Sequence, residues 1–266
     1  MIHPTAIVHA KAKVDETVQV GPYAIIDEHV ELGANCVVGP QAYLTGWTTA
    51  GANNRFHAGC VIGDAPQDLK YADEPTRLRI GDNNVFREHA TVHRSTKPDG
   101  ETVIGSSCFI MVNAHVGHNC AVGDGVIIAN GALLAGHVTV GDKAFISGNC
   151  LTHQFVRVGT LALMQGGAAI SQDLPPFTVG SHGGNTMCGL NTVGLRRAGF
   201  TSEQRMELKK LYRLLFRSGH NLREAVALAQ KEFTAGPARV MLDFVASTKR
   251  GICYDVGQER GENEAE

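Results

Sequence analysis

Aliphatic side chains recur at every sixth position along the first 170 residues of the chain. Stepping by six from Ile2 to Ile170 visits 29 positions, and 21 of them are Ile, Leu or Val. A small side chain follows four positions after the aliphatic one, as at Ala24, Cys36 and Ala114. Short strands that join at tight corners and point one aliphatic side chain inward per hexad produce this pattern.

The hexads predict a mainly β fold, a left-handed parallel β-helix with three hexads per turn, over residues 1–176. This winding is an exception to the right-handed crossovers of most parallel sheets. Glycine often follows the aliphatic residue, as at Gly33, Gly117 and Gly141. We expect unusual backbone angles at these corners, because glycine adopts them at least cost.

The hexad phase fails in two polar, proline-containing segments, about 64–79 and 94–102, which we predict to be excursion loops. Pro175 and Pro176 end the repeat, and a linker is expected over 177–200. Helical periodicity then predicts an α-helical domain over 201–256, opened by a capping box of Thr201 and Gln204. The acidic tail, 257–266, is expected to be disordered.

Charge and composition exclude several classes of function. Lys and Arg number 24 against 26 Asp and Glu, so no overall positive field attracts nucleic acid. No apolar run approaches the ~18 residues that would span a bilayer, so no membrane insertion is expected. The N-terminus lacks the pattern of a secretory signal, and we expect a cytoplasmic protein. Residues 201–250 contain ten Lys or Arg against five Asp or Glu, a charge that could attract an acidic protein partner.

The cysteines follow the same hexad pattern. Five of the seven take the small inward position, where a thiol acts as a compact apolar group. They are Cys36, Cys60, Cys108, Cys120 and Cys150. Because the sequence contains no CxxC pair, metal binding and redox chemistry lose most of their support.

Histidine is frequent, with 12 residues. Five of them stand at the corner beside the aliphatic residue, and we predict that these lie on the prism surface: His3, His9, His57, His93 and His153. A denser group contains His115, His118, His137 and His153. On one interpretation, any one of these is simply a tolerated surface histidine. A zinc site between neighbouring chains is another, although no acidic residue or cysteine is placed with this group in sequence.

A coil of eighteen residues would stack His118 on Gly136, and Asn119 on His137, about 4.8 Å apart. A histidine can take a proton from a sugar hydroxyl as a general base. A glycine N–H beside it can donate to the oxygen that becomes negative when a thioester carbonyl is attacked. The spacing therefore favours acyl transfer.

Several motifs occur in an order that resembles one family. They are APQDLKY at 65–71, VHR at 92–94, NAHVGH at 113–118, AGH at 135–137, HQF at 153–155, DLPP at 173–176 and GLNTVGLRRAGF at 189–200. Together they are similar to acyl-[acyl-carrier-protein]:UDP-N-acetylglucosamine O-acyltransferases, which catalyse the first step of lipid A synthesis. The resemblance covers nearly the whole chain.

The resemblance implies a homotrimer with active sites between adjacent chains, and it implies no cofactor and no metal. His118 matches the general base that activates the 3-hydroxyl of UDP-N-acetylglucosamine, and Gly136 matches the amide facing the oxyanion. The basic helices match the docking surface for acyl carrier protein. Substrate-binding positions are matched by Asp68, Lys70, His93, His115, His137, His153, Gln154, Asn191 and Arg197.

At three positions the residue in this chain differs from the one found in family members. Asn119 stands where members have aspartate after the catalytic histidine; an amide can accept from the ring N–H but does not stabilise an imidazolium. Val193 stands where some members have glutamate near the nucleotide. Gly166 stands where a bulky side chain shortens the acyl groove, so we expect a long groove and a long hydroxyacyl chain.

Three other functions stay open from the sequence. An N-acyltransferase acting on a 3-amino sugar nucleotide would use the same histidine base. A weakly active paralogue that binds sugar nucleotides is conceivable because of Asn119. A metal-dependent hydratase could share the fold.

Overall fold

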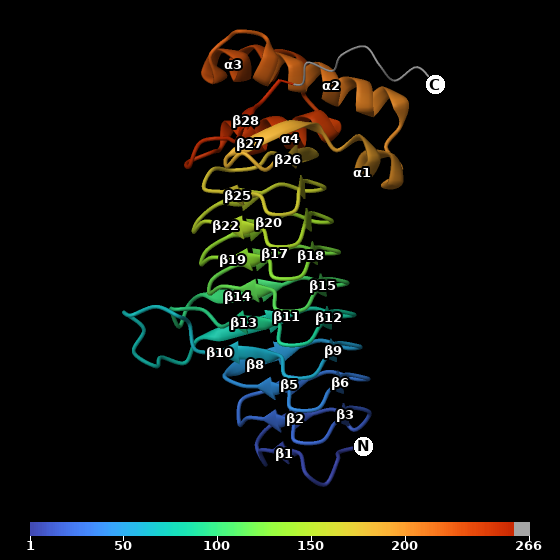
Figure 1. The fold of residues 1–266 in the computed structure, drawn as a ribbon, viewed down its shortest axis with the longest axis vertical. Helices are drawn as coiled ribbons and strands as arrows, with labels where there is room; N and C mark the ends of the chain where they lie inside the picture. The colour runs from blue at the N-terminus through green and yellow to red at the C-terminus, as the bar shows by residue number, and fades with distance from the viewer. Residues whose placement is uncertain (258–266) are drawn as a thin grey trace.

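The computed structural model describes residues 1–257 and shows a three-sided prism of β-strands with helices at its C-terminal end (Figure 1). The predicted left-handed parallel β-helix with a helical domain after it is confirmed. The acidic tail expected over 257–266 lies, from residue 258 onward, outside the described residues.

Three sheets form the faces of the prism, and most strands are two residues long. Their strands pair in parallel except for β26 and β27, which pair antiparallel at the C-terminal end of the third sheet. The first face contains β1 (Ile7–Val8), β4 (Ile25–Ile26), β7 (Tyr43–Leu44), β10 (Val61–Asp64), β13 (Thr91–His93), β16 (His115–Val116), β19 (Leu133–Leu134), β22 (Leu151–Thr152) and β25 (Ala169–Ile170). The second contains β2 (Lys13–Val14), β5 (Glu31–Leu32), β8 (Trp47–Ala50), β11 (Arg77–Ile80), β14 (Glu101–Ile104), β17 (Ala121–Val122), β20 (Thr139–Val140) and β23 (Arg157–Val158). The third contains β3 (Gln19–Val20), β6 (Val37–Val38), β9 (Arg55–Phe56), β12 (Val85–Phe86), β15 (Phe109–Ile110), β18 (Ile127–Ile128), β21 (Phe145–Ile146), β24 (Leu163–Met164), β26 (Thr178–Gly180), β27 (Thr186–Leu190) and β28 (Tyr254–Asp255).

Successive coils pair at a fixed step wherever no loop intervenes. His115 pairs with Leu133, and Leu133 pairs in turn with Leu151, a step of eighteen residues each time. Across the first loop the step lengthens, and Val61 pairs with Thr91. The two loops, 65–76 and 94–100, leave the prism between β10 and β11 and between β13 and β14.

The prism interior is filled by the inward aliphatic and small side chains. Val116, Leu134 and Ile146 have no exposed surface, and Phe56 stacks on Phe86 with ring centroids 5.2 Å apart. The five cysteines at the small inward positions of the hexads are all buried, as predicted. Burial raises the pKa of the Cys60 and Cys120 thiols to about 12, so they stay protonated and act as apolar filling.

The unusual backbone angle expected at the corner glycines is present at Gly63, which has a φ of 85°, but the expectation is wrong for the three glycines named for it. Among Gly33, Gly117 and Gly141, none has a positive φ; the left-handed residue is two positions later, at Asn35, Asn119 and Lys143. Close stacking of the coils explains these glycines instead. A Cβ on Gly33 would lie 2.8 Å from the backbone of Gly51, and one on Gly117 would lie 2.8 Å from the oxygen of Leu134.

Four helices follow the prism: α1 (Thr192–Arg197), α2 (Ser202–Arg217), α3 (Leu222–Glu232) and α4 (Gly236–Ala246). The predicted capping box is present, with Thr201 Oγ1 accepting from Gln204 N–H and Gln204 Oε1 accepting from Thr201 N–H. The segment expected as a linker, 177–200, contains β26, β27 and α1. The prism therefore continues past residue 176, because β26 pairs with β24.

One buried ion pair joins the prism to the helical domain. Arg157 lies 2.7 Å from the carboxylate of Asp173, which is almost wholly buried, and the same guanidinium donates to the backbone oxygen of Phe244 in α4. Among the described helices, none is long and apolar enough to cross a membrane.

Candidate active site

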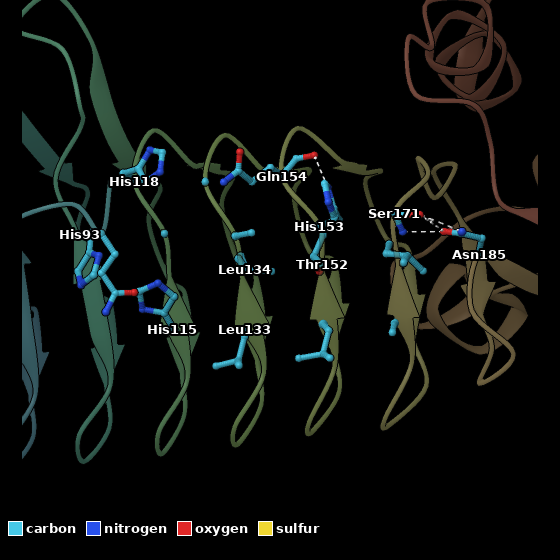
Figure 2. A pocket seen from close by; sticks show the side chains of 17 residues that line it. His93, His115, His118, Leu133, Leu134, Thr152, His153, Gln154, Ser171 and Asn185 are labelled. Carbon is cyan, nitrogen blue, oxygen red and sulfur yellow. Dashed lines mark hydrogen bonds between the residues drawn. The ribbon is translucent and has the colours of Figure 1, made fainter. Parts of the chain in front are cut away.

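A cleft of about 590 Å³ opens along the first face of the prism, at the corner that follows β16, β19 and β22. Figure 2 shows its side chains on successive coils, with His93 and His115 at one end and Ser171 and Asn185 at the other. The fixed step of the coils places His118, Gly136 and Gln154 at corresponding corners of neighbouring coils. Apolar lining comes from Leu133, Leu151 and Ala169 among others.

The predicted stacking of His118 on Gly136 is present. A Cβ built on Gly136 would lie 2.5 Å from both Nε2 and Cε1 of His118, so the ring rests directly on the glycine backbone. Only glycine leaves room for the imidazole there. A Cβ on Gly117 would lie 2.9 Å from the Gly136 nitrogen, so the bare Gly117 keeps the space beside that amide open.

Asn119 holds the other side of the His118 ring. Its Oδ1 lies 2.9 Å from His118 Nδ1. The same oxygen accepts from the N–H of Thr96 at 3.1 Å and from its hydroxyl at 2.9 Å. Because an amide oxygen only accepts, the ring proton is on Nδ1 and the lone pair is on Nε2, which faces Gly136.

His93 and His115 form a neutral pair at one end of the cleft. Their rings meet edge to face at 4.8 Å, and His115 Nδ1 lies 2.7 Å from Thr91 Oγ1. Burial, with the neighbouring His93 and His118, lowers the pKa of His115 to about 4. Burial also lowers the pKa of His93. Both rings are therefore hydrogen-bonding groups without charge at neutral pH.

The prediction that His93 lies on the prism surface is wrong, because its side chain is only 8% exposed. Its Nδ1 is a buried atom with no hydrogen-bond partner among the described residues. The residue nevertheless lines the cleft.

His137 packs beside His118 on the next coil. Its ring meets that of His118 edge to face at 5.2 Å and stacks on Phe155 at 4.6 Å. Burial lowers the pKa of His137, and His118 and Lys97 add to the effect. His137 and Phe155 both have positive φ, so the stack is held at the corner by the backbone.

The comparisons with known proteins cover most of the chain. Residues 173–253 match the model described as UDP N-acetylglucosamine O-acyltransferase, domain 2, and residues 11–46 and 101–136 match the bacterial transferase hexapeptide model. The chain is 49% identical over 255 residues to the acyl-[acyl-carrier-protein]–UDP-N-acetylglucosamine O-acyltransferase of Syntrophobacter fumaroxidans, covering 94% of this chain and 98% of the relative. It is 48% identical to the enzyme of the same name from Thermodesulfovibrio yellowstonii, covering 95% and 98%. The chain belongs to the UDP-N-acetylglucosamine O-acyltransferase family.

A solved structure agrees with this assignment. The UDP-N-acetylglucosamine acyltransferase LpxA from Bacteroides fragilis superposes with a TM-score of 0.90 at 37% identity, covering 95% of this chain and 99% of that one. The protein is therefore an acyltransferase with the fold of this family.

Some of the other residues expected to bind substrate line the cleft, and others do not. His153 and Gln154 line it, and Gln67 reaches it from the first loop. Asp68 accepts from the N–H of Lys70 in that loop, and neither lines the cleft.

His137 does not line the cleft of this chain either, and three further expected positions lie outside it. Gly166 is exposed at the corner before β25. Asn191 caps α1, where it accepts from Gly194 N–H and donates to Leu161 O. Arg197 is exposed at the end of α1.

Some lining residues of the acyltransferase were missed from the sequence. Ser171 stands eighteen residues after His153 and could have been found by the same step. Asn185, whose Oδ1 accepts from Ser171 N–H at 2.6 Å, lies beyond the regular hexads. No three His, Cys, Asp or Glu side chains within residues 1–257 are placed to hold a metal ion.

Proposed function

We propose that the protein transfers a 3-hydroxyacyl chain from acyl carrier protein to the 3-hydroxyl of UDP-N-acetylglucosamine, the first step of lipid A biosynthesis. The names of the relatives support this substrate pair. The observation that carries the mechanism is the contact of His118 with Gly136, where a basic nitrogen and a backbone amide adjoin.

In the proposed mechanism, Nε2 of His118 takes the proton of the sugar 3-hydroxyl as that oxygen attacks the thioester carbonyl. The carbonyl oxygen becomes negative and accepts from the Gly136 N–H. The tetrahedral intermediate then collapses, the C–S bond breaks, and the proton held by His118 passes to the sulfur of the leaving thiol. Asn119 keeps the proton on Nδ1 throughout, so Nε2 alone exchanges its proton.

The neutral imidazoles support a sugar-binding role. His93, His115 and His137 can each donate one hydrogen bond and accept another without carrying charge. His153 and Gln154 would face the diphosphate side of the substrate. Asp68 and Lys70 would contact substrate when the first loop folds over the cleft.

A trimer would complete the site. Leu133 and Leu151 are 41% and 48% exposed on one face of the prism, an apolar stripe that a neighbouring chain would cover. Asn191 and Arg197 lie away from the cleft of their own chain, so we propose that they reach the nucleotide bound at a neighbouring one. The acyl chain would run along the same face toward Gly166.

The helical domain is the proposed docking surface for acyl carrier protein, since its ten basic residues over 201–250 complement an acidic partner. We also propose a cytoplasmic location. The buried thiols of Cys60 and Cys150 fill the prism interior, a use of cysteine that suits a reducing compartment.

The decisive experiment incubates purified protein with UDP-N-acetylglucosamine and a panel of 3-hydroxyacyl carrier proteins, followed by mass analysis of the product. An O-acylated sugar nucleotide is expected, and His118→Ala should abolish it. A parallel reaction with the 3-amino sugar nucleotide distinguishes N-acylation. A product formed equally by His118→Ala would contradict the proposed mechanism.

A further inference from the structure

The second loop, between β13 and β14, reaches the proposed base through the amide of Asn119. Both ends of this amide are bound. Oδ1 accepts from Thr96 N–H and from Thr96 Oγ1–H, and Nδ2 donates to Ser95 Oγ at 2.6 Å. The backbone N–H of Asn119 donates to Thr102 Oγ1 at 2.8 Å, which fixes the residue on the corner.

These contacts allow one orientation of the amide. The Ser95 hydroxyl donates to the oxygen of Lys97 at 3.2 Å, and its oxygen accepts from the Lys97 N–H and from the Asn119 NH2 group. A flipped amide would place its NH2 group against the backbone N–H of Thr96, which can only donate, and its oxygen against the Ser95 hydroxyl, which would have to leave the oxygen of Lys97 in order to donate. Buried groups left without partners in this way are costly.

The orientation decides the tautomer of His118. With Oδ1 toward the ring, Nδ1 carries the proton and Nε2 faces Gly136 with its lone pair free. With the NH2 group toward the ring, Nδ1 would have to accept and Nε2 would carry the proton. A base in that second state could not accept a proton from a hydroxyl lying beside Gly136.

We propose that Ser95 and Thr96 are positioning residues that hold the Asn119 amide oxygen toward His118 and thereby select the reactive tautomer. An aspartate would not need them for this purpose, because its two oxygens are equivalent. The kinetic part of the proposal rests on the proposed acyltransferase function. The part that concerns the tautomer stands on the hydrogen bonds alone.

The kinetic test measures Ser95→Ala in two backgrounds. In the natural chain, loss of the acceptor for Nδ2 should lower kcat roughly tenfold with little change in KM. In the Asn119→Asp background the same substitution should lower kcat less than twofold. Ser106→Ala, which removes a hydroxyl from a corner remote from His118, is the matched control. Equal losses in both backgrounds would show that Ser95 acts only on the loop and would overturn the proposal.

Thr96→Val gives an intermediate case, because it removes the hydroxyl and keeps the backbone N–H that Oδ1 also accepts. We expect a loss of about threefold in the natural chain. A loss as large in the Asn119→Asp background would count against the proposal.

Imidazole ¹⁵N shifts of His118 test the tautomer without turnover. The signals are assigned by comparison with His118→Gln. The intact protein should show a protonated Nδ1 and an unprotonated Nε2, and Ser95→Ala should show a mixture of the two tautomers. An unchanged tautomer in Ser95→Ala would refute the proposal. If the natural chain transferred no acyl group, the proposed function would fail, while these spectra would still decide on the role of Ser95.

Discussion

The imidazole of His118 occupies the space that a side chain on Gly136 would fill. A methyl group there would stand 2.5 Å from Nε2 and Cε1 of the ring, a distance that real side chains do not reach. The base and the amide proposed to face the oxyanion are thus fixed against each other by adjacent coils.

Gly136→Ala should therefore displace the His118 ring and lower kcat by at least about 100-fold, because the base and the Gly136 amide that faces the oxyanion lose their alignment. Steady-state acyl transfer measures the effect, and circular dichroism checks that the β-helix is retained. Gly148→Ala is the control, because its Cβ would meet its nearest atom, Asn130 O, at 3.4 Å. Full activity in Gly136→Ala would argue against the assigned roles of both residues.

Asn119→Asp should raise kcat roughly tenfold at neutral pH. A carboxylate accepts the same hydrogen bond from Nδ1 and in addition stabilises the imidazolium that forms when His118 takes a proton. Comparison of kcat and KM for the two forms provides the measurement. A lower kcat in a folded Asn119→Asp protein would mean that the neutral amide is the better partner at this site.

The free energy of unfolding should fall in acid because of His115. Its pKa is lowered to about 4, whereas the unfolded chain titrates near 6.5. Between these values the unfolded state binds more protons, so stability present above pH 6.5 is lost as the pH falls toward 4. Urea unfolding at pH 7 and pH 5 should show that His115→Gln loses about 2 kcal/mol less than the natural protein over this interval. The same loss in both proteins would contradict the interpretation of His115 as a buried neutral ring.

Gly166→Met should shift the preference of the enzyme toward shorter acyl donors. Space is available for the new side chain, since a Cβ at residue 166 has its nearest neighbour, Gly148 O, at 3.5 Å. We expect kcat/KM to fall by about 100-fold for the longest donors and to change little for short ones. Competition between long and short 3-hydroxyacyl carrier proteins measures the ratio. An unchanged ratio would show that residue 166 does not limit the acyl groove.

Arg157→Ala should destabilise the junction between prism and helical domain by about 3 kcal/mol, because it leaves the carboxylate of Asp173 buried without its partner. Arg157→Ala combined with Asp173→Asn should recover part of that loss. Arg239→Ala breaks an exposed pair with Asp243 and should cost less than about 1 kcal/mol. Equal losses in the two single variants, measured by urea unfolding, would contradict the argument from burial.

Sequence reasoning succeeded wherever the hexad period continues unbroken. The period alone gives a step of eighteen residues, and that step predicts the contact of His118 with Gly136 between two coils. The same step would have found Ser171. Helices α2 and α3 were equally accessible, because Thr201 and Asn221 carry recognisable capping side chains that the structure confirms.

The loops could not be predicted in the same way. The contacts of Ser95 and Thr96 with Asn119 join residues 23 and 24 positions apart through irregular backbone, and no period relates them. His93 was expected at the surface because its position in the hexad points outward, but its side chain is buried. The corner glycines were interpreted by φ, whereas the decisive contact is made with the next coil, which single-residue preferences do not describe.

Each coil forms its backbone pairs only with the coil before and the coil after it, as the pairing of β1 with β4 and of β4 with β7 illustrates. A whole turn could be deleted or duplicated ahead of β10 without moving any group of the cleft relative to another. The number of coils in the N-terminal half can therefore change during evolution. A shortened or extended β-helix would also let the length of the molecule be engineered without altering the catalytic geometry.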